Sequence, residues 1–234
     1  MFGGVSEYLE DLMARIDTPL LDDLTLQFFD QPTSGVPQLP QTIHCIEKFK
    51  TPHKAVLDFY DYSADITLTS RWRNGGHLRL EFECDGLDRQ LSLLEQVFSQ
   101  CFPLPSHVDA LELWDHENRP YQDARATLWL ALLRPFHAVR SLLFWDQESM
   151  SQIAHVLGDL TEERAAEVLP MLCIIVWYGS GDWDEVEPWL IPLLQPFIDA
   201  RERSGHPMEV PGHEWFHLPL TSYSSNTNCP HVLS

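Results

Sequence analysis

Two eight-residue runs, Val108-Asp-Ala-Leu-Glu-Leu-Trp-Asp115 and Val139-Arg-Ser-Leu-Leu-Phe-Trp-Asp146, share the pattern Val-x-x-Leu-x-(Leu/Phe)-Trp-Asp and lie 31 residues apart. A looser copy, Leu172-Cys-Ile-Ile-Val-Trp-Tyr178, begins 33 residues after the second run. Earlier copies occupy residues 21–28 and 78–82. Apolar residues alternate along each run, which is typical of a β-strand with one buried face. The recurrence predicts a protein built from repeated units.

Segments with helical spacing separate these predicted strands. After Asp88, a predicted N-cap, one apolar helical face consists of Leu91, Leu94, Val97, Phe98 and Cys101. Strand and helix alternating at a period near 31 predict an α/β fold, an irregular leucine-rich-repeat-like solenoid with a mainly parallel sheet. A doubly wound sheet is the alternative arrangement of such units, and the recurring Leu-x-x-Leu-x-Leu spacing favours the solenoid.

Three further helices are expected from their N-terminal signals. Ser149 with Gln152 reads as a capping box, Thr161 as the cap of a short helix, and Asp182 with Glu185 as the start of the last helix. Prolines at positions 188, 192 and 196 predict kinks or a delayed start in that last helix, because proline lacks the N–H that a helix interior needs.

One part of the chain departs from the strand–helix alternation. Residues 55–60, 65–69 and 77–83 read as three strands in succession, and Asn74-Gly75-Gly76 supplies a turn before the third. We therefore expect a β-hairpin insertion that interrupts the helical layer.

Composition limits the partners of this chain. It has a formal net charge of −20 and a sequence pI near 4.7. Nucleic acids and anionic membrane surfaces attract basic proteins, so neither is expected as a partner. If charge steers binding, the partner is a protein with a basic patch.

The cysteines point to a reducing compartment. The five residues are odd in number and widely spaced (Cys45, Cys84, Cys101, Cys173 and Cys229), which is the usage of free thiols. The N-terminus lacks the pattern of a signal peptide, and the apolar stretch at residues 169–178 is too short to cross a bilayer. A cytoplasmic or nuclear location is expected.

Six segments resemble, in the same order, the recurring segments of large basidiomycete F-box proteins. They are residues 4–24, 51–69, 90–102, 132–143, 163–172 and 200–207. In that family this region is a degenerate leucine-rich-repeat array that follows an F-box. The resemblance therefore implies a solenoid over residues 1–210, and residues 211–234 are expected to form a disordered tail.

The resemblance also implies a function. In the family, the F-box recruits the Skp1-type adaptor of a cullin ubiquitin ligase and the repeats select substrates. The given sequence contains no recognisable F-box, so a Skp1-type adaptor is expected only if an F-box lies upstream. The alternative is a structural or vestigial repeat fragment without a ligase role.

The tail contains a literal H-E-x-x-H pattern, His213-Glu-Trp-Phe-His217. On a helix this pattern binds zinc and supports hydrolysis, so a zinc-dependent hydrolase is a further alternative. Pro211 and Pro219 flank the pattern and no carboxylate follows Glu214, which disfavours that alternative. We also interpret the acidic residues 182–187 as a helix start rather than a cation site. We expect no enzyme activity, no cofactor and no resident metal.

The strand pattern predicts one binding face. If Leu111, Leu113, Leu142 and Phe144 point to the core, the residues between them point to the opposite face of the sheet. The predicted protein-binding residues on that face are Glu112, Trp114, Leu143, Trp145 and Tyr178. Aromatic side chains in a row are good interface anchors, so this face is expected to contact the partner.

Overall fold

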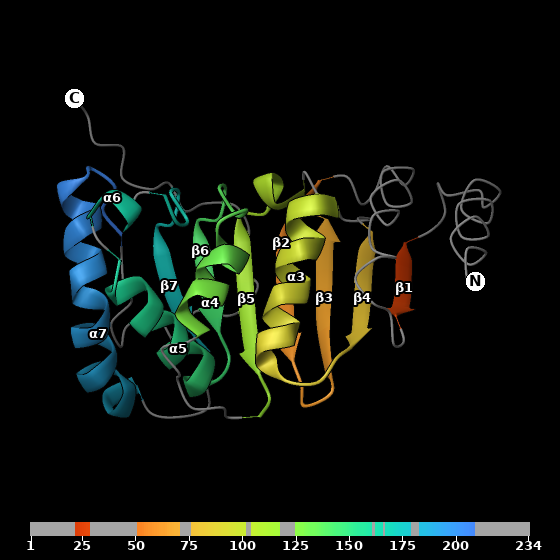
Figure 1. Ribbon diagram of the computed structural model, residues 1–234. Helices are drawn as coiled ribbons and strands as arrows, with labels where there is room; N and C mark the ends of the chain where they lie inside the picture. Colours follow the sequence, from red (N-terminus) through yellow and green to blue (C-terminus); the bar gives the residue numbers. More distant parts are fainter. Residues whose placement is uncertain are drawn as a thin grey trace.

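The computed structural model of the 234-residue chain describes residues 22–28, 51–70, 76–101, 104–117, 125–160, 162–165, 167–178 and 183–208. Its strands form one seven-stranded sheet (Figure 1). The strands are β1 (Asp23–Phe28), β2 (Pro52–Phe59), β3 (Ser63–Ser70), β4 (His77–Glu83), β5 (Ala110–Asp115), β6 (Ser141–Phe144) and β7 (Ile174–Trp177).

The order of strands across the sheet is β1-β4-β3-β2-β5-β6-β7. Strand β3 runs antiparallel to both of its neighbours, whereas the pairs β1–β4, β2–β5, β5–β6 and β6–β7 are parallel. The prediction of an α/β protein with a mainly parallel sheet is confirmed. The hairpin predicted within residues 55–83 is also confirmed, because β2, β3 and β4 form an antiparallel meander.

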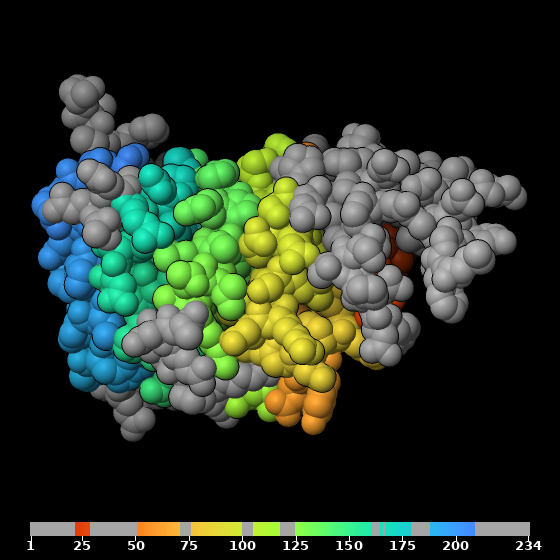
Figure 2. Space-filling view, viewed as in Figure 1, coloured from red at the N-terminus to blue at the C-terminus, as the bar shows by residue number. Residues whose placement is uncertain are grey.

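The helices that connect the strands lie in front of the sheet in Figure 1, on one face. They are α3 (Leu87–Cys101), α4 (Ala126–Leu133), α5 (Gln147–Gly158) and α6 (Glu162–Ala165), together with a short 3₁₀ helix at Leu104–His107. Helix α7 (Trp183–Arg203) follows β7 and packs against α5 and α6. In the space-filling view these helical segments form most of the surface over the central strands (Figure 2). A doubly wound sheet has helices on both faces, which is not the arrangement of these connections.

The main core lies between the sheet and the helices. Leu111, Leu113 and Leu142 are completely buried there and Phe144 nearly so, as their alternation with polar and aromatic neighbours predicts. Leu91, Leu94, Val97 and Phe98 of α3 are buried against the same core, so the predicted helical face is confirmed for these four residues. The alternation thus decides which side of each strand faces the helices.

Two predicted N-caps are wrong. Asp146 caps α5: its Oδ1 accepts a hydrogen bond of 2.6 Å from the backbone N–H of Ser149. Ser149 is the third residue of the helix, within its first turn, and is completely buried. Helix α3 begins at Leu87, so Asp88 lies in its first turn, where its Oδ1 accepts from Nε of Arg125 at 2.6 Å. Both helices therefore start earlier than the sequence signals indicated.

Helix α7 contains Pro188, Pro192 and Pro196, so of the two predicted outcomes, kinks or a delayed start, the delayed start is wrong. The spacing of four residues places all three on one stripe of the helix, and all three are exposed. The backbone carbonyls that lose their N–H partners on this stripe lie next to solvent, where water can satisfy them.

The cysteines differ in state. Cys84 is a half-buried free thiol, and burial raises its pKa to about 11. Cys173 is disulfide-bonded, so the expectation of a free thiol is wrong at this position.

None of the described helices combines the length and the apolarity that crossing a bilayer requires.

A candidate binding face on the open side of the sheet

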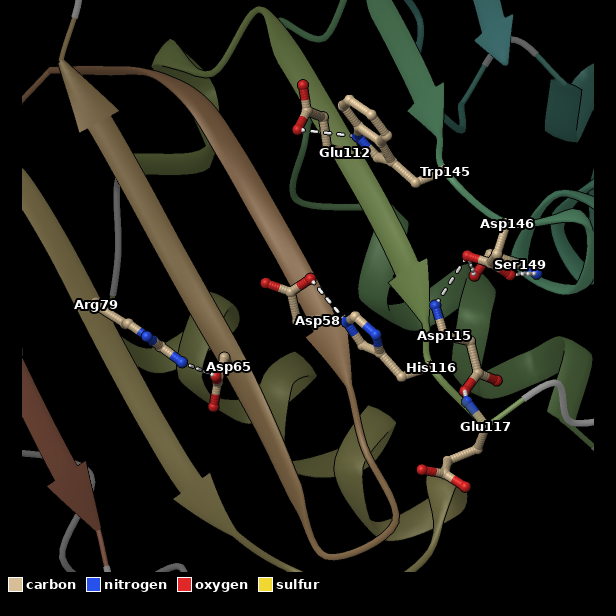
Figure 3. Close-up of polar contacts among 10 residues, drawn as sticks. All are labelled: Asp58, Asp65, Arg79, Glu112, Asp115, His116, Glu117, Trp145, Asp146 and Ser149. Atoms are coloured by element: carbon tan, nitrogen blue, oxygen red, sulfur yellow. Dashed lines mark hydrogen bonds and ion pairs between the residues drawn. The ribbon is translucent and has the colours of Figure 1, made fainter. Parts of the chain in front are cut away.

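The sheet face opposite the connecting helices carries alternate residues of the strands, among them Asp58 of β2, Asp65 of β3, Arg79 of β4 and Glu112 of β5 (Figure 3). Strand register places Gln27, Glu81, Asp65, Asp58 and Trp114 next to one another, in that order, from β1 to β5. Aromatic residues at the ends of β6 and β7 continue this row. This row is therefore acidic from β1 to β2 and aromatic from β5 to β7.

Five rings stack in a continuous series over β2, β5, β6 and β7. In order they are Tyr60, His116, Trp114, Trp145 and Tyr178, and we call them the ring stack. Successive ring centroids are 4.3, 4.5, 5.6 and 4.9 Å apart, with interplanar angles of 6°, 24°, 18° and 28°. Spacings near the distance between adjacent strands allow neighbouring rings to stack, and each such contact adds about 0.5–1.5 kcal/mol.

The geometry of the ring stack decides what it presents to solvent. His116, Trp114 and Trp145 have a ring on each side, so they can offer only their edges to a partner. Tyr60 and Tyr178 are the first and the last ring of the stack. Trp114 is 37% exposed, and among the described residues the other exposed large apolar side chains are Tyr62, at 73%, and Met171, at 44%.

The structure brings three of the five predicted binding residues together: Trp114, Trp145 and Tyr178 all belong to the ring stack. Glu112 and Leu143 lie on the same face, but the expectation that they are accessible is wrong, since they are only 8% and 7% exposed. Leu143 belongs to a small apolar cluster with Ile174 and Val176. A buried aliphatic side chain of this kind stabilises the fold and is no anchor for a partner.

Glu112 is occupied by contacts within the protein. Its Oε1 forms an ion pair of 2.7 Å with Nζ of Lys54, and its Oε2 accepts a hydrogen bond of 3.3 Å from Nε1 of Trp145 (Figure 3). The carboxylate thus fixes the orientation of the indole ring in the stack. We interpret Glu112 as a residue that positions Trp145.

Sequence reasoning missed Tyr60 and His116. His116 lies two residues after Trp114, so the same alternation that selected Trp114 extends to it. Tyr60 follows the end of β2, and its ring reaches His116 because β2 pairs with β5 in parallel. The first of these residues has a local signal, whereas the second depends on the strand order.

Polar contacts hold the acidic part of the row. Arg79 donates from Nη2 to Oδ2 of Asp65 at 2.7 Å, and its Nε lies 3.0 Å from Oε1 of Glu81. His116 and Asp58 form a further pair, with 3.5 Å between Nε2 and Oδ1. Burial raises the pKa of Asp58 and of Asp65, and the cationic neighbours of each only partly oppose this effect.

The aspartate that follows the tryptophan in each repeated run, Asp115 or Asp146, has a structural role. Asp146, besides capping α5, accepts through Oδ2 a hydrogen bond of 2.9 Å from the backbone N–H of Asp115, the equivalent residue 31 positions earlier. Asp115 in turn accepts at 3.1 Å from the backbone N–H of Glu117. Burial raises the pKa of Asp146 despite these hydrogen bonds. These contacts join consecutive strand ends below the ring stack.

We expect the protein to become more heat-stable as the pH falls from neutral toward the ordinary aspartate pKa of 3.8. Asp58, Asp65 and Asp146 have a folded-state pKa above the usual value, so the folded chain holds their protons up to a higher pH than the unfolded chain does. Proton uptake therefore stabilises the fold, and this gain is lost as the pH rises through the folded-state pKa. The melting temperature at fixed ionic strength measures the effect.

The net charge of −20 predicts the same direction through general repulsion, so a salt control is needed. High salt screens exposed charges and acts much less on buried ones. The gain on acidification should persist in 0.5 M NaCl. A melting temperature that falls on acidification at either salt concentration would contradict the prediction.

Some predicted features lie outside the described residues. These are the H-E-x-x-H pattern at His213 to His217, the tail from 211 to 234, Cys45, Thr161 and Asp182. Among the residues that the structure describes, no group of three or more His, Cys, Asp or Glu side chains could hold a metal ion. Searches of protein-family models and of curated proteins found no match to the chain.

Proposed function

We propose that this chain is a protein-binding domain whose partner docks on the open sheet face across the ring stack. One observation carries the proposal: five stacked rings lie on one face of the sheet, and Trp114, in the middle of the stack, is 37% exposed. Tryptophan and tyrosine supply large contact areas at a small entropic cost and dominate the binding energy of many interfaces. The ring stack is also preorganised, which reduces the cost of binding.

We further propose that the strand–helix units form an irregular leucine-rich-repeat-like solenoid. Strands β5, β6 and β7 follow one another in the sheet, and their connecting helices lie on one face. The hydrogen bond from Asp115 N–H to Asp146 joins the same position of two consecutive units, as stacking of repeats requires. In an F-box-type ubiquitin ligase subunit, such a solenoid would be the substrate-recognition region.

The binding proposal predicts that the double substitution Trp114→Ala and Trp145→Ala raises the dissociation constant for a partner at least about tenfold, which is the scale of an interface hot spot. Partners would first be selected from a displayed peptide library against the purified full chain. Their dissociation constants would then be compared for the parent and the variants. Removal of two neighbouring rings takes away contact area and leaves the ends of the stack unsupported.

Met171→Ala is the matched control, because Met171 is 44% exposed and lies in the turn before β7. This substitution should leave binding unchanged, and circular dichroism should show all variants folded. Failure to select any peptide, or peptides that bind the double variant as well as the parent, would contradict the proposal and favour a structural fragment. Co-purification of a Skp1-type adaptor with the full-length gene product tests the ligase role separately, and its failure would remove that role.

A further inference from the structure

The loop between α4 and β6 gathers positive charge in an otherwise acidic chain. Residues 124–145 contain no Asp or Glu, although the chain has 35 of these residues in 234. The same stretch contains Arg134, His137 and Arg140, and all three are exposed. We call these three residues the basic rim. Its local charge is opposite to the net charge of −20.

The basic rim lies where the last three strands begin. The backbone N–H of Arg140 donates to the carbonyl oxygen of Asp109, which precedes β5, at 2.8 Å. The carbonyl oxygen of Arg140 accepts at 2.8 Å from the backbone N–H of Cys173, which precedes β7. Strand β6 separates Arg140 from Trp145 by roughly 17 Å of extended chain. The basic rim and the ring stack are therefore separate surfaces at opposite ends of the same strands.

The fold does not use the side chains of the basic rim. In the part of the chain that the structure describes, none of the three forms a hydrogen bond or an ion pair through its side chain. Arg140 forms no ion pair with Asp109, although their backbones are neighbours. Arg134 follows α4, where a positive charge suits the helix dipole, but this interaction leaves its guanidinium N–H groups free to donate. By contrast, carboxylates pair with Lys54, Arg79 and Arg125.

We infer that the basic rim binds an acidic segment of a partner protein, whose carboxylates accept hydrogen bonds from Arg134 and Arg140. Planar guanidinium groups match the geometry of carboxylates, and the imidazole of His137 can donate in either protonation state. Charges more than about 8 Å away are largely screened at physiological ionic strength, so the local charge outweighs the net charge of the chain. This surface goes beyond the proposed function, because it is distinct from the ring stack and takes a ligand of the opposite charge.

The size of the basic rim favours a peptide over a nucleic acid. A nucleic acid binds through many phosphates and needs an extended basic footprint. The basic rim has only two arginines and one histidine, and the chain that surrounds it is strongly acidic. A short acidic segment can contact the basic rim alone.

The test is an NMR titration of the isotopically labelled full chain with two peptides. The acidic probe is Gly-Glu-Glu-Ser-Glu-Glu-Gly with blocked ends, and the neutral probe has glutamine in place of every glutamate. We expect the acidic probe to shift the amide signals of His137, Arg140 and Ser141, and the neutral probe to bind at least about tenfold more weakly. Equal affinity for the two probes, or shifts confined to other residues, would overturn the inference.

Substitutions then locate the site. Arg134→Gln and Arg140→Gln should each raise the dissociation constant of the acidic probe about threefold, and together about tenfold, as expected for exposed ion pairs. Arg89→Gln makes the same charge change at an exposed position in the first turn of α3 and should leave binding unchanged. An equal loss in Arg89→Gln would reduce the effect to general attraction and overturn the site. All of these side chains are exposed, so the variants should melt at the temperature of the parent.

Two further measurements separate the alternatives. The double substitution Trp114→Ala and Trp145→Ala should leave the acidic probe unaffected, so the two proposals can fail independently. A loss in that variant as large as in the double arginine variant would place the probe on the ring stack and overturn the inference. A single-stranded oligouridylate of the same charge should bind no more tightly than the acidic probe, and tighter binding of this RNA would overturn the assignment to an acidic protein segment.

Discussion

Arg201→Met should lower the free energy of unfolding by about 2–4 kcal/mol, since it removes charged hydrogen bonds and leaves buried carbonyls unsatisfied. Arg201 is 1% exposed, although it carries a guanidinium group. The group donates from Nη1 to the carbonyl oxygens of Leu169 and Pro170 at 3.3 and 3.0 Å, and from Nη2 to that of Leu172 at 2.7 Å. Burial lowers the pKa of Arg201, so part of the loss is offset by relief of desolvation.

The carbonyls belong to a turn that needs this support. Leu169 has φ of +49°, a left-handed conformation that is unfavourable for a bulky side chain, and it is completely buried. Arg201 joins this turn to α7, and the turn leads directly into β7. Loss of the guanidinium would therefore loosen both the last strand and the last helix.

Chemical denaturation of three variants separates the contribution of the charge of Arg201 to stability from that of its planar hydrogen-bonding geometry. Arg201→Lys keeps the charge but cannot reach three carbonyls with a planar group, so it should lose most of the same stability. Arg203→Met removes an exposed arginine two residues away and should change the free energy of unfolding by less than about 0.5 kcal/mol. Parent-like stability of Arg201→Met would contradict the assigned role.

Gly158→Ala should destabilise the fold by about 1–3 kcal/mol through overpacking. Gly158 is the last residue of α5, and a Cβ there would lie 2.3 Å from the backbone carbonyl oxygen of Leu193 in α7. A backbone atom cannot move aside as a flexible side chain can, so the two helices must separate. The helix propensity of alanine, about 0.5–1 kcal/mol better than that of glycine, opposes the loss only partly.

Gly205→Ala is the comparison, because a Cβ at Gly205 would have no atom within 4 Å. Its φ of +80° predicts a loss of about 1 kcal/mol from backbone strain alone. Thermal or chemical unfolding should therefore rank the parent first and Gly158→Ala last. A Gly158→Ala protein as stable as the parent would show that α5 and α7 do not approach so closely.

Much of the sheet could be predicted from local patterns. The runs at 108–115 and 139–146 each contain the strand that the structure has, and their core-facing residues are buried as expected. The helix boundaries were harder to predict. Asp146 lies at the end of one predicted strand, so its role as the cap of α5 depends on where that strand stops. The three prolines of α7 are tolerated because they lie on the side of the helix that tertiary packing leaves exposed to solvent.

By itself, the sequence determined the strands, the faces of β5 and β6 that enter the core, and the acidic character of the chain, because alternation and charge are properties of neighbouring residues. Only the tertiary structure decided that β2 lies between β3 and β5. That order places Tyr60 against His116 and completes the ring stack. Pairing of strands distant in sequence depends on the packing of the whole sheet and helical layer, so no local pattern could have predicted it.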